Sequence, residues 1–184
     1  MNNVAANVAI FLVHTLFTLY IAALMLRVLL ATVRADFYNP FSQFLVTITN
    51  PIVLPLRRMI PSVGGIDSAS MSLMLALMML ELWLLALITG EALGLATLIV
   101  IALLQLAELL IYIFIFALIV QAVISWVAPT QAYDNPAVSI LHDLTRPLLQ
   151  PVRRVLPPVG MVDLSPLLVI IGLYVLLIIL RSLY

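Results

Sequence analysis

Residues 39–67 read NPFSQFLVTITNPIVLPLRRMIPSVGGID, and residues 135–163 read NPAVSILHDLTRPLLQPVRRVLPPVGMVD. The two stretches align without a gap at a separation of 96 positions, and 12 of their 29 residues are identical. The identities include four prolines and two adjacent arginines. Such a match predicts two copies of one structural unit, but it contains no catalytic motif.

The composition around these stretches is that of a membrane protein. The 184-residue chain is 65% apolar and 9% charged, and its mean hydropathy is +1.27. A soluble domain carries roughly 25% charged residues. The chain has no cysteine, which excludes thiol catalysis, thiolate metal sites, disulfides and prenylation. Its net charge of zero gives no reason to expect direct contact with nucleic acid.

Four apolar runs are long enough to cross a bilayer, which takes about 20 residues. They cover residues 4–33, 70–89, 97–127 and 166–183. The first run lacks a positive leading segment and is too long for a signal peptide, so we expect it to remain as a span. We therefore predict an all-α membrane protein whose four transmembrane helices form two tandem, parallel hairpin repeats. Residues 1–90 form the first repeat, with loop 34–69, and residues 91–184 form the second, with loop 128–165.

The arginines predict the orientation, since the chain has no lysine. Both long loops carry arginines, whereas the turn at residues 90–96 carries only Glu91. Positive charge stays on the cytoplasmic side of a membrane. We expect both loops to be cytoplasmic and both termini to lie on the opposite, outer side of the membrane, although Arg181 mildly opposes this. Because each repeat holds an even number of spans, the two copies enter the membrane the same way up.

Each loop is expected to hold two short helices. Asn39-Pro40 and Asn135-Pro136 have the pattern of a helix cap followed by a first helical residue. Apolar residues then follow at helical spacing, at positions 41, 44, 45 and 48 and at positions 137, 140, 141 and 144. We predict that Pro51 and Pro147 end the first helix of each loop. A second element then covers residues 52–60 or 148–156. The structural motif is completed by Pro55, Pro61 and Asp67 and by Pro151, Pro157 and Asp163.

An amphipathic helix that ends in paired arginines suits the lipid headgroup layer, where guanidinium groups meet phosphate. The candidate lipid- or partner-binding residues are Arg57, Arg58, Arg146, Arg153 and Arg154. The competing interpretation is that these arginines only fix the topology of the adjacent spans.

Polar residues within the spans are the other candidates, because ionisable groups in hydrocarbon are costly. They are His14, Arg27, Glu81, Glu108 and Gln121. Aligning the first and third spans at an offset of 94 places His14 on Glu108 and Arg27 on Gln121. We predict that His14 and Glu108 pair, either as a structural hydrogen bond or as part of a proton or cation path. We expect Glu81 near mid-membrane, and Arg27 to extend its charge toward the cytoplasmic surface.

Together these motifs resemble the YggT family, also called YlmG, in its two-unit bacterial form. The residues that carry the resemblance are Asn39-Pro40, Thr49-Asn50-Pro51, Pro55, Arg57-Arg58, Pro61, Gly64 and Asp67, with Ile124-Ser125-Trp126, Asn135-Pro136, Leu144-Thr145-Arg146-Pro147, Pro151, Arg153-Arg154, Pro157, Gly160 and Asp163-Leu164-Ser165-Pro166 in the second unit. Gln121 departs from the family, which usually has an arginine there, as at Arg27.

The resemblance implies links to osmotic-stress tolerance and potassium homeostasis, to nucleoid and division-site organisation, and, in plastid relatives, to cytochrome b₆ maturation. It implies no catalytic residue and no cofactor. We expect a non-enzymatic inner-membrane scaffold or assembly factor that binds membrane lipids and other membrane proteins or itself. The alternative is a potassium or osmolyte transport component that acts as an oligomer. An intramembrane enzyme is disfavoured, because zincin and nucleophile-elbow motifs are absent, and we expect no metal site.

Overall fold

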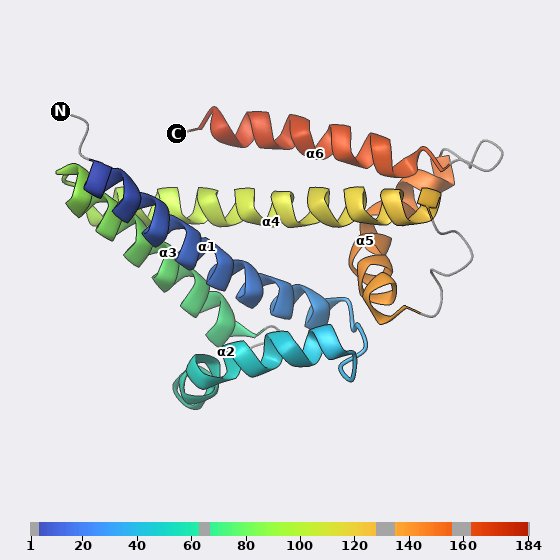
Figure 1. Ribbon diagram of the computed structural model, residues 1–184, viewed down its shortest axis with the longest axis horizontal. Helices are drawn as coiled ribbons and strands as arrows, with labels where there is room; N and C mark the ends of the chain where they lie inside the picture. Colours follow the sequence, from blue (N-terminus) through green and yellow to red (C-terminus); the bar gives the residue numbers. More distant parts are fainter. Residues whose placement is uncertain (1–3, 63–66, 128–134, 156–162, 184) are drawn as a thin grey trace. The chain divides into compact units, whose positions relative to one another are not determined.

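The computed structural model describes residues 4–62, 67–127, 135–155 and 163–183. These ranges form six α-helices and contain no strand, which confirms the all-helical prediction. In chain order the helices are α1 (Val4–Thr32), α2 (Pro40–Met59), α3 (Ser68–Thr89), α4 (Leu95–Val127), α5 (Pro136–Val155) and α6 (Ser165–Arg181) (Figure 1).

Three of these helices, α1, α3 and α4, are long and apolar enough to cross a membrane. The apolar helix α6 has 17 residues. At about 1.5 Å per residue it is about 25 Å long, slightly less than the hydrocarbon core of a bilayer, which is about 30 Å thick. The apolar runs of the sequence therefore coincide with helices α1, α3, α4 and α6, although α4 begins at Leu95, two residues before its expected start.

The ends of α2, α3 and α5 follow from local chemistry. Asn39 Oδ1 accepts a hydrogen bond from the Phe41 amide at 3.0 Å, and Asn135 Oδ1 accepts one from the Ala137 amide at 2.9 Å. Each asparagine thereby satisfies one of the free amides at a helix start, as the sequence predicted. At the other end of α3, Gly90 adopts the left-handed conformation (φ 78°) that commonly terminates a helix.

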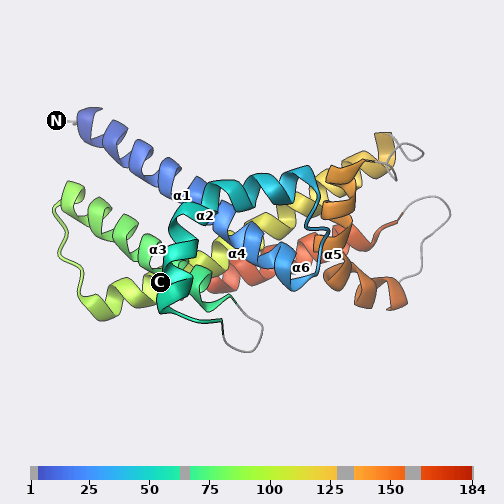
Figure 2. The same ribbon diagram turned by 90° about the horizontal axis from the view of Figure 1, so that it is seen from below.

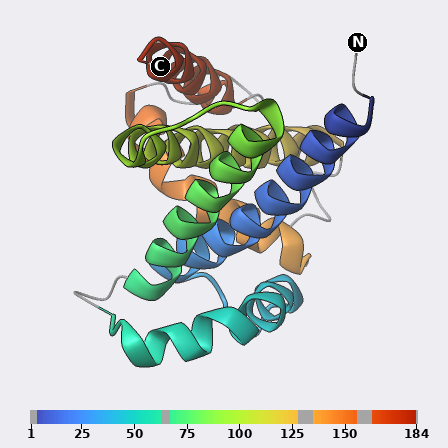
Figure 3. The same ribbon diagram turned by 90° about the vertical axis from the view of Figure 1, so that its left-hand side faces the viewer.

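The prediction that Pro51 and Pro147 end a helix was wrong. α2 and α5 each continue through two internal prolines, at 51 and 55 and at 147 and 151. Figures 2 and 3 show α2 changing direction part-way along its length. A proline removes one backbone hydrogen bond and crowds the preceding turn, which kinks a helix without necessarily stopping it. The prediction for Pro61 holds, since α2 ends at Met59; Pro157, Gly64 and Gly160 lie outside the described residues.

The chain divides into two compact units that do not coincide with the two halves of the sequence. The first unit comprises Met1–Val28 and Leu45–Leu109, and the second comprises Leu29–Phe44 and Leu110–Tyr184. In the first unit the buried side chains include Ile21, Leu24 and Val53. In the second, α6 runs beside α4 (Figure 1), where Leu177 packs against Ile111 and Ile115, and α5 also packs against α6.

Candidate functional site

The last turn of α2 is joined to the first turn of α3 by an ion pair. Arg57 Nε lies 3.3 Å from Asp67 Oδ1, and Arg57 Nη2 bonds Asp67 Oδ2. Asp67 also caps α3, since its Oδ1 accepts the Ser70 amide at 3.2 Å and its Oδ2 accepts the Ser70 hydroxyl at 2.6 Å. One carboxylate therefore holds the end of one helix and the start of the next.

A similar ion pair joins α5 to α6, although Asp163 lies one residue before the N-cap of α6. Arg153 Nε and Nη2 lie 2.9 and 2.7 Å from Asp163 Oδ2, and the Ser165 amide donates to Asp163 Oδ1 at 2.9 Å. In both places the arginine and the aspartate are ten residues apart. We call these two ion pairs the arginine–aspartate clamps.

The clamps alter the ionisation of their carboxyl groups. Partial burial raises the pKa of Asp67, but the hydrogen bonds from Arg57 and Ser70 outweigh it, and the net pKa lies below its usual value. The pKa of Asp163 is lowered in the same way, with hydrogen bonds from Ser165 and Arg153 outweighing burial. Both carboxylates are therefore charged at neutral pH.

The second arginine of each pair differs from the first in having no ion pair within the described part of the chain. Arg58 and Arg154 are exposed, and so is Arg57. Arg146 on α5 is exposed as well. The repeated Arg-Arg pattern predicted that each pair acts as one binding element, whereas in the structure only the first arginine of each pair is ion-paired.

A second repeated contact joins α1 to α2 and α4 to α5. In the first unit, Arg27 Nη1 donates to Thr49 Oγ1 at 2.6 Å, and the Thr49 hydroxyl donates to the Leu45 carbonyl at 2.6 Å. In the second unit, Thr145 Oγ1 bonds Gln121 Oε1. Both threonines are fully buried, so each aligned position, 27 and 121, supplies the polar partner of a buried hydroxyl.

The second unit holds a small cavity of about 40 Å³ beside its clamp. Its lining residues are Gln121, Ala122, Ser125, Arg153, Asp163 and Pro166. A site of this size and polarity has room for water, which needs about 10–15 Å³ and two to four polar partners.

Within the first unit, α1 and α3 are joined by a polar pair. His14 Nδ1 lies 2.7 Å from Glu81 Oε1; the His14 side chain is 62% exposed and that of Glu81 is 2% exposed. Glu81 Oε2 is buried with no hydrogen-bond partner among the described residues. The prediction that paired His14 with Glu108 was wrong, because pairing depends on how each helix is rotated, which an alignment of two helices does not fix. Glu108 is buried and has an interaction of its own.

No group of three or more potential metal ligands occurs among the residues that the structure describes. The polar contacts that recur in both copies are the two clamps and the two threonine contacts, and one histidine–glutamate pair joins α1 to α3.

The CCB3/YggT family model matches residues 6–88 and, a second time, residues 100–184. This chain belongs to the CCB3/YggT family. It is 39% identical over 170 residues to the Escherichia coli K12 protein named "Uncharacterized protein YggT", covering 92% of this chain and 87% of that one. It is 42% identical over 165 residues to a Vibrio alginolyticus protein named "Uncharacterized protein in proC 3'region", covering 89% and 88% of the two chains. No solved structure matches the chain.

Four candidate residues have partners that the sequence did not predict. Arg57 and Arg153 were expected to bind lipid or a partner protein, whereas they bind Asp67 and Asp163. The partners of Arg27 and Gln121 are Thr49 and Thr145. A signal was available, because the arginines, the aspartates and both threonines are among the 12 identities between the repeated stretches. Polar residues that recur at the same spacing in both copies are expected to contact one another, because the two copies share one structure.

Proposed function

We propose that this chain is a non-enzymatic scaffold or assembly factor of the bacterial inner membrane that binds anionic lipid headgroups through Arg58 and Arg154. It would cross the membrane four times, with α6 as the fourth span, and its two tandem repeats would place α2 and α5 at the cytoplasmic surface. Other membrane proteins, or a second copy of the chain, would bind beside the lipid.

The observation that carries the proposal is that only the first arginine of each pair is bound to an aspartate. Arg57 and Arg153 are fixed by aspartates, so each clamp holds its helix end in place. The following residue, Arg58 or Arg154, is left exposed. An exposed guanidinium on a fixed backbone can bind a phosphate through two parallel hydrogen bonds.

The recurrence of both contact types supports the tandem arrangement. The clamps and the threonine contacts appear once in each matched stretch of the family. Two equivalent arginines in parallel repeats would face the same leaflet, where anionic lipids attract basic residues with about 1 kcal/mol per residue.

The test is lipid retention by the purified chain. The double variant Arg58→Gln/Arg154→Gln removes both charges, whereas Arg58→Lys/Arg154→Lys keeps the charge and loses only the planar fork. Native mass spectrometry from micelles that contain phosphatidylglycerol and phosphatidylcholine gives the ratio of the two lipids bound. We expect the glutamine variant to lose the preference for phosphatidylglycerol and the lysine variant to keep part of it. An unchanged ratio in the glutamine variant contradicts the proposal.

A second candidate, transport of a proton, potassium or another osmolyte by an oligomer, is favoured by one observation. The His14–Glu81 pair places two ionisable groups within helices that are long enough to span a membrane. Such residues often mark ion pathways. Flux into liposomes under an imposed gradient, lost in Glu81→Gln, would support this candidate, and the absence of flux from the unaltered chain would count against it.

A further inference from the structure

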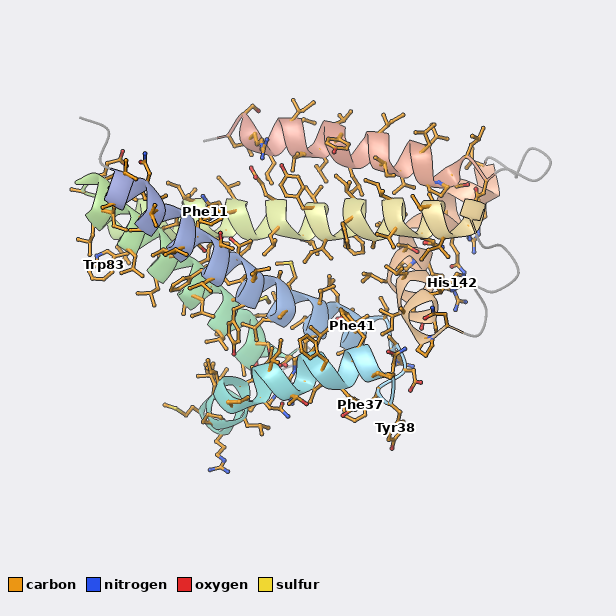
Figure 4. All side chains as sticks on the ribbon, viewed as in Figure 1. Phe11, Phe37, Tyr38, Phe41, Trp83 and His142 are labelled. Carbon is orange, nitrogen blue, oxygen red and sulfur yellow. The ribbon has the colours of Figure 1, made fainter. Side chains whose placement is uncertain are left out.

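Four exposed aromatic side chains lie within eight residues between the end of α1 and the first turns of α2. They are Phe37, Tyr38, Phe41 and Phe44, with exposed fractions of 57%, 85%, 40% and 57%. All four belong to the second unit. Figure 4 shows the rings of Phe37 and Tyr38 projecting away from the ribbon. We call these four residues the aromatic patch.

The backbone that presents the aromatic patch is held by specific hydrogen bonds. Asp36 Oδ1 accepts the Tyr38 amide at 2.9 Å, and Gln43 Nε2 donates to the Phe37 carbonyl at 2.7 Å. Asn39 caps α2 and also donates from Nδ2 to the Pro136 carbonyl at 2.6 Å. The Phe37 and Tyr38 rings meet edge to face, with their centroids 5.8 Å apart. The rings are therefore presented outward by an ordered turn.

The aromatic patch has no equivalent on α5. The residue that aligns with Phe41 is Ala137, and the residue that aligns with Phe44 is Ile140, which is 4% exposed. The only large apolar side chain that α5 exposes is Val155, at its end. Among the described residues, the exposed aromatic side chains at positions 41 and 44 are thus a property of one copy and are not required by the shape that the two copies share.

We infer that the aromatic patch inserts into the boundary between the headgroups and the acyl chains of the cytoplasmic leaflet, so that α2 is the membrane-inserted member of the α2/α5 pair. This inference rests on the proposed function, which places both helices at the lipid surface. Its separate basis is chain continuity. Phe37 lies five residues after Thr32, where α1 ends. α1 is long enough to span a membrane, and five residues reach at most about 17 Å when fully extended.

The chemistry of the aromatic patch fits this location. Phenylalanine supplies apolar area, and the tyrosine adds a hydroxyl that can remain in contact with water. Tyrosine and tryptophan are enriched at the level of the headgroups in membrane proteins. An exposed cluster of this kind within one short segment is uncommon on a water-facing surface and marks an interaction site.

The test measures the depth of single tryptophans. The chain has two tryptophans, which are replaced in a Trp83→Phe/Trp126→Phe background. Phe41→Trp then reports on the aromatic patch, and Ala137→Trp is the matched control at the aligned, exposed position of α5. Each variant is placed in neutral phosphatidylcholine vesicles with brominated acyl chains, and circular dichroism checks that it is folded. Phe44→Trp provides a second reporter if Phe41→Trp does not fold.

We expect brominated lipid to quench Phe41→Trp several-fold more than Ala137→Trp, and aqueous iodide to quench the two in the opposite order. Equal quenching of the two variants by brominated lipid overturns the inference. A blue-shifted Phe41→Trp signal that neither agent quenches also overturns it, because the aromatic patch would then be covered by protein. Neutral vesicles keep this result independent of the anionic-lipid test, so the inference and the proposed function can fail separately.

Discussion

Replacing Asp67 should separate the two tasks that this carboxylate performs. It caps α3 through Ser70 and binds Arg57. Asparagine is as good a helix cap as aspartate but carries no charge. Alanine removes both the cap and the ion pair. The two substitutions therefore differ by the cap alone.

The expected magnitudes follow from exposure. The Arg57 side chain is 43% exposed and that of Asp67 is 13% exposed, so solvent screens the ion pair. A pair of this kind contributes about 0.5 kcal/mol. Loss of a cap costs about 1 kcal/mol. We expect Asp67→Asn to lower the free energy of unfolding by about 0.5 kcal/mol and Asp67→Ala to lower it by about 1.5 kcal/mol.

The measurement is reversible unfolding in mixed micelles of dodecyl maltoside and sodium dodecyl sulfate, followed by circular dichroism. Asp163→Ala is the matched control. Its carboxylate accepts the Ser165 amide, while Pro166 stands where α3 has Ser70, so its cost should be smaller than that of Asp67→Ala. If Asp67→Asn costs as much as Asp67→Ala, the cap contributes nothing and the reasoning is refuted.

Three other predictions concern pH, the polar pair and topology. Because the folded pKa of Asp67 is lowered, its ion pair should stabilise the chain fully above the unfolded pKa of about 3.9 and lose this effect as the pH falls through the folded pKa. The difference in the free energy of unfolding between the unaltered chain and Asp67→Asn, measured from pH 8 down to about pH 3, should be constant at first and decrease at the acid end. A double-mutant cycle of His14→Ala and Glu81→Gln should give a coupling of about 0.6 kcal/mol, the average for polar pairs between membrane helices, and at most about 1.7 kcal/mol. A value near zero would mean that the contact contributes nothing. The chain has no cysteine, so Arg58→Cys provides a single thiol on α2. A membrane-impermeant maleimide should label this thiol in inverted vesicles and not in intact cells. Labelling in intact cells would contradict a cytoplasmic α2.

The helices themselves were predictable because hydropathy reflects a strong physical constraint. A chain in hydrocarbon must satisfy its backbone hydrogen bonds internally, and helices are the local way to do so. The starts of α2 and α5 were predictable for a similar reason, since an asparagine followed by proline satisfies the local requirements of a helix start. These features depend on neighbouring residues, which the sequence displays directly.

The errors concern features that depend on distant residues. A proline at position 51 or 147 removes one backbone hydrogen bond of the helix. Whether the helix continues beyond it depends on which side chains of the following turns are buried against other parts of the protein. There, Val53 and Leu149 are fully buried, so continuing the helix keeps an apolar face packed. Likewise, the partner of His14 depends on the rotation of α1 against α3. Hydropathy gives no information about rotation when a helix is apolar on all sides.

The continuation of α2 through its two prolines has a consequence for the energetics of the proposed lipid binding. Many peripheral segments are disordered in water and fold only upon contact with lipid, so that part of the interaction energy is consumed in ordering the backbone. Here the proline-containing segment is already helical, with the Phe41 amide capped by Asn39 and its last turn anchored by Asp67. On the proposed function, Arg58 would therefore meet a lipid phosphate without a folding step. Binding would then reduce the conformational entropy of little more than one side chain, which is the advantage of a preorganised binding site.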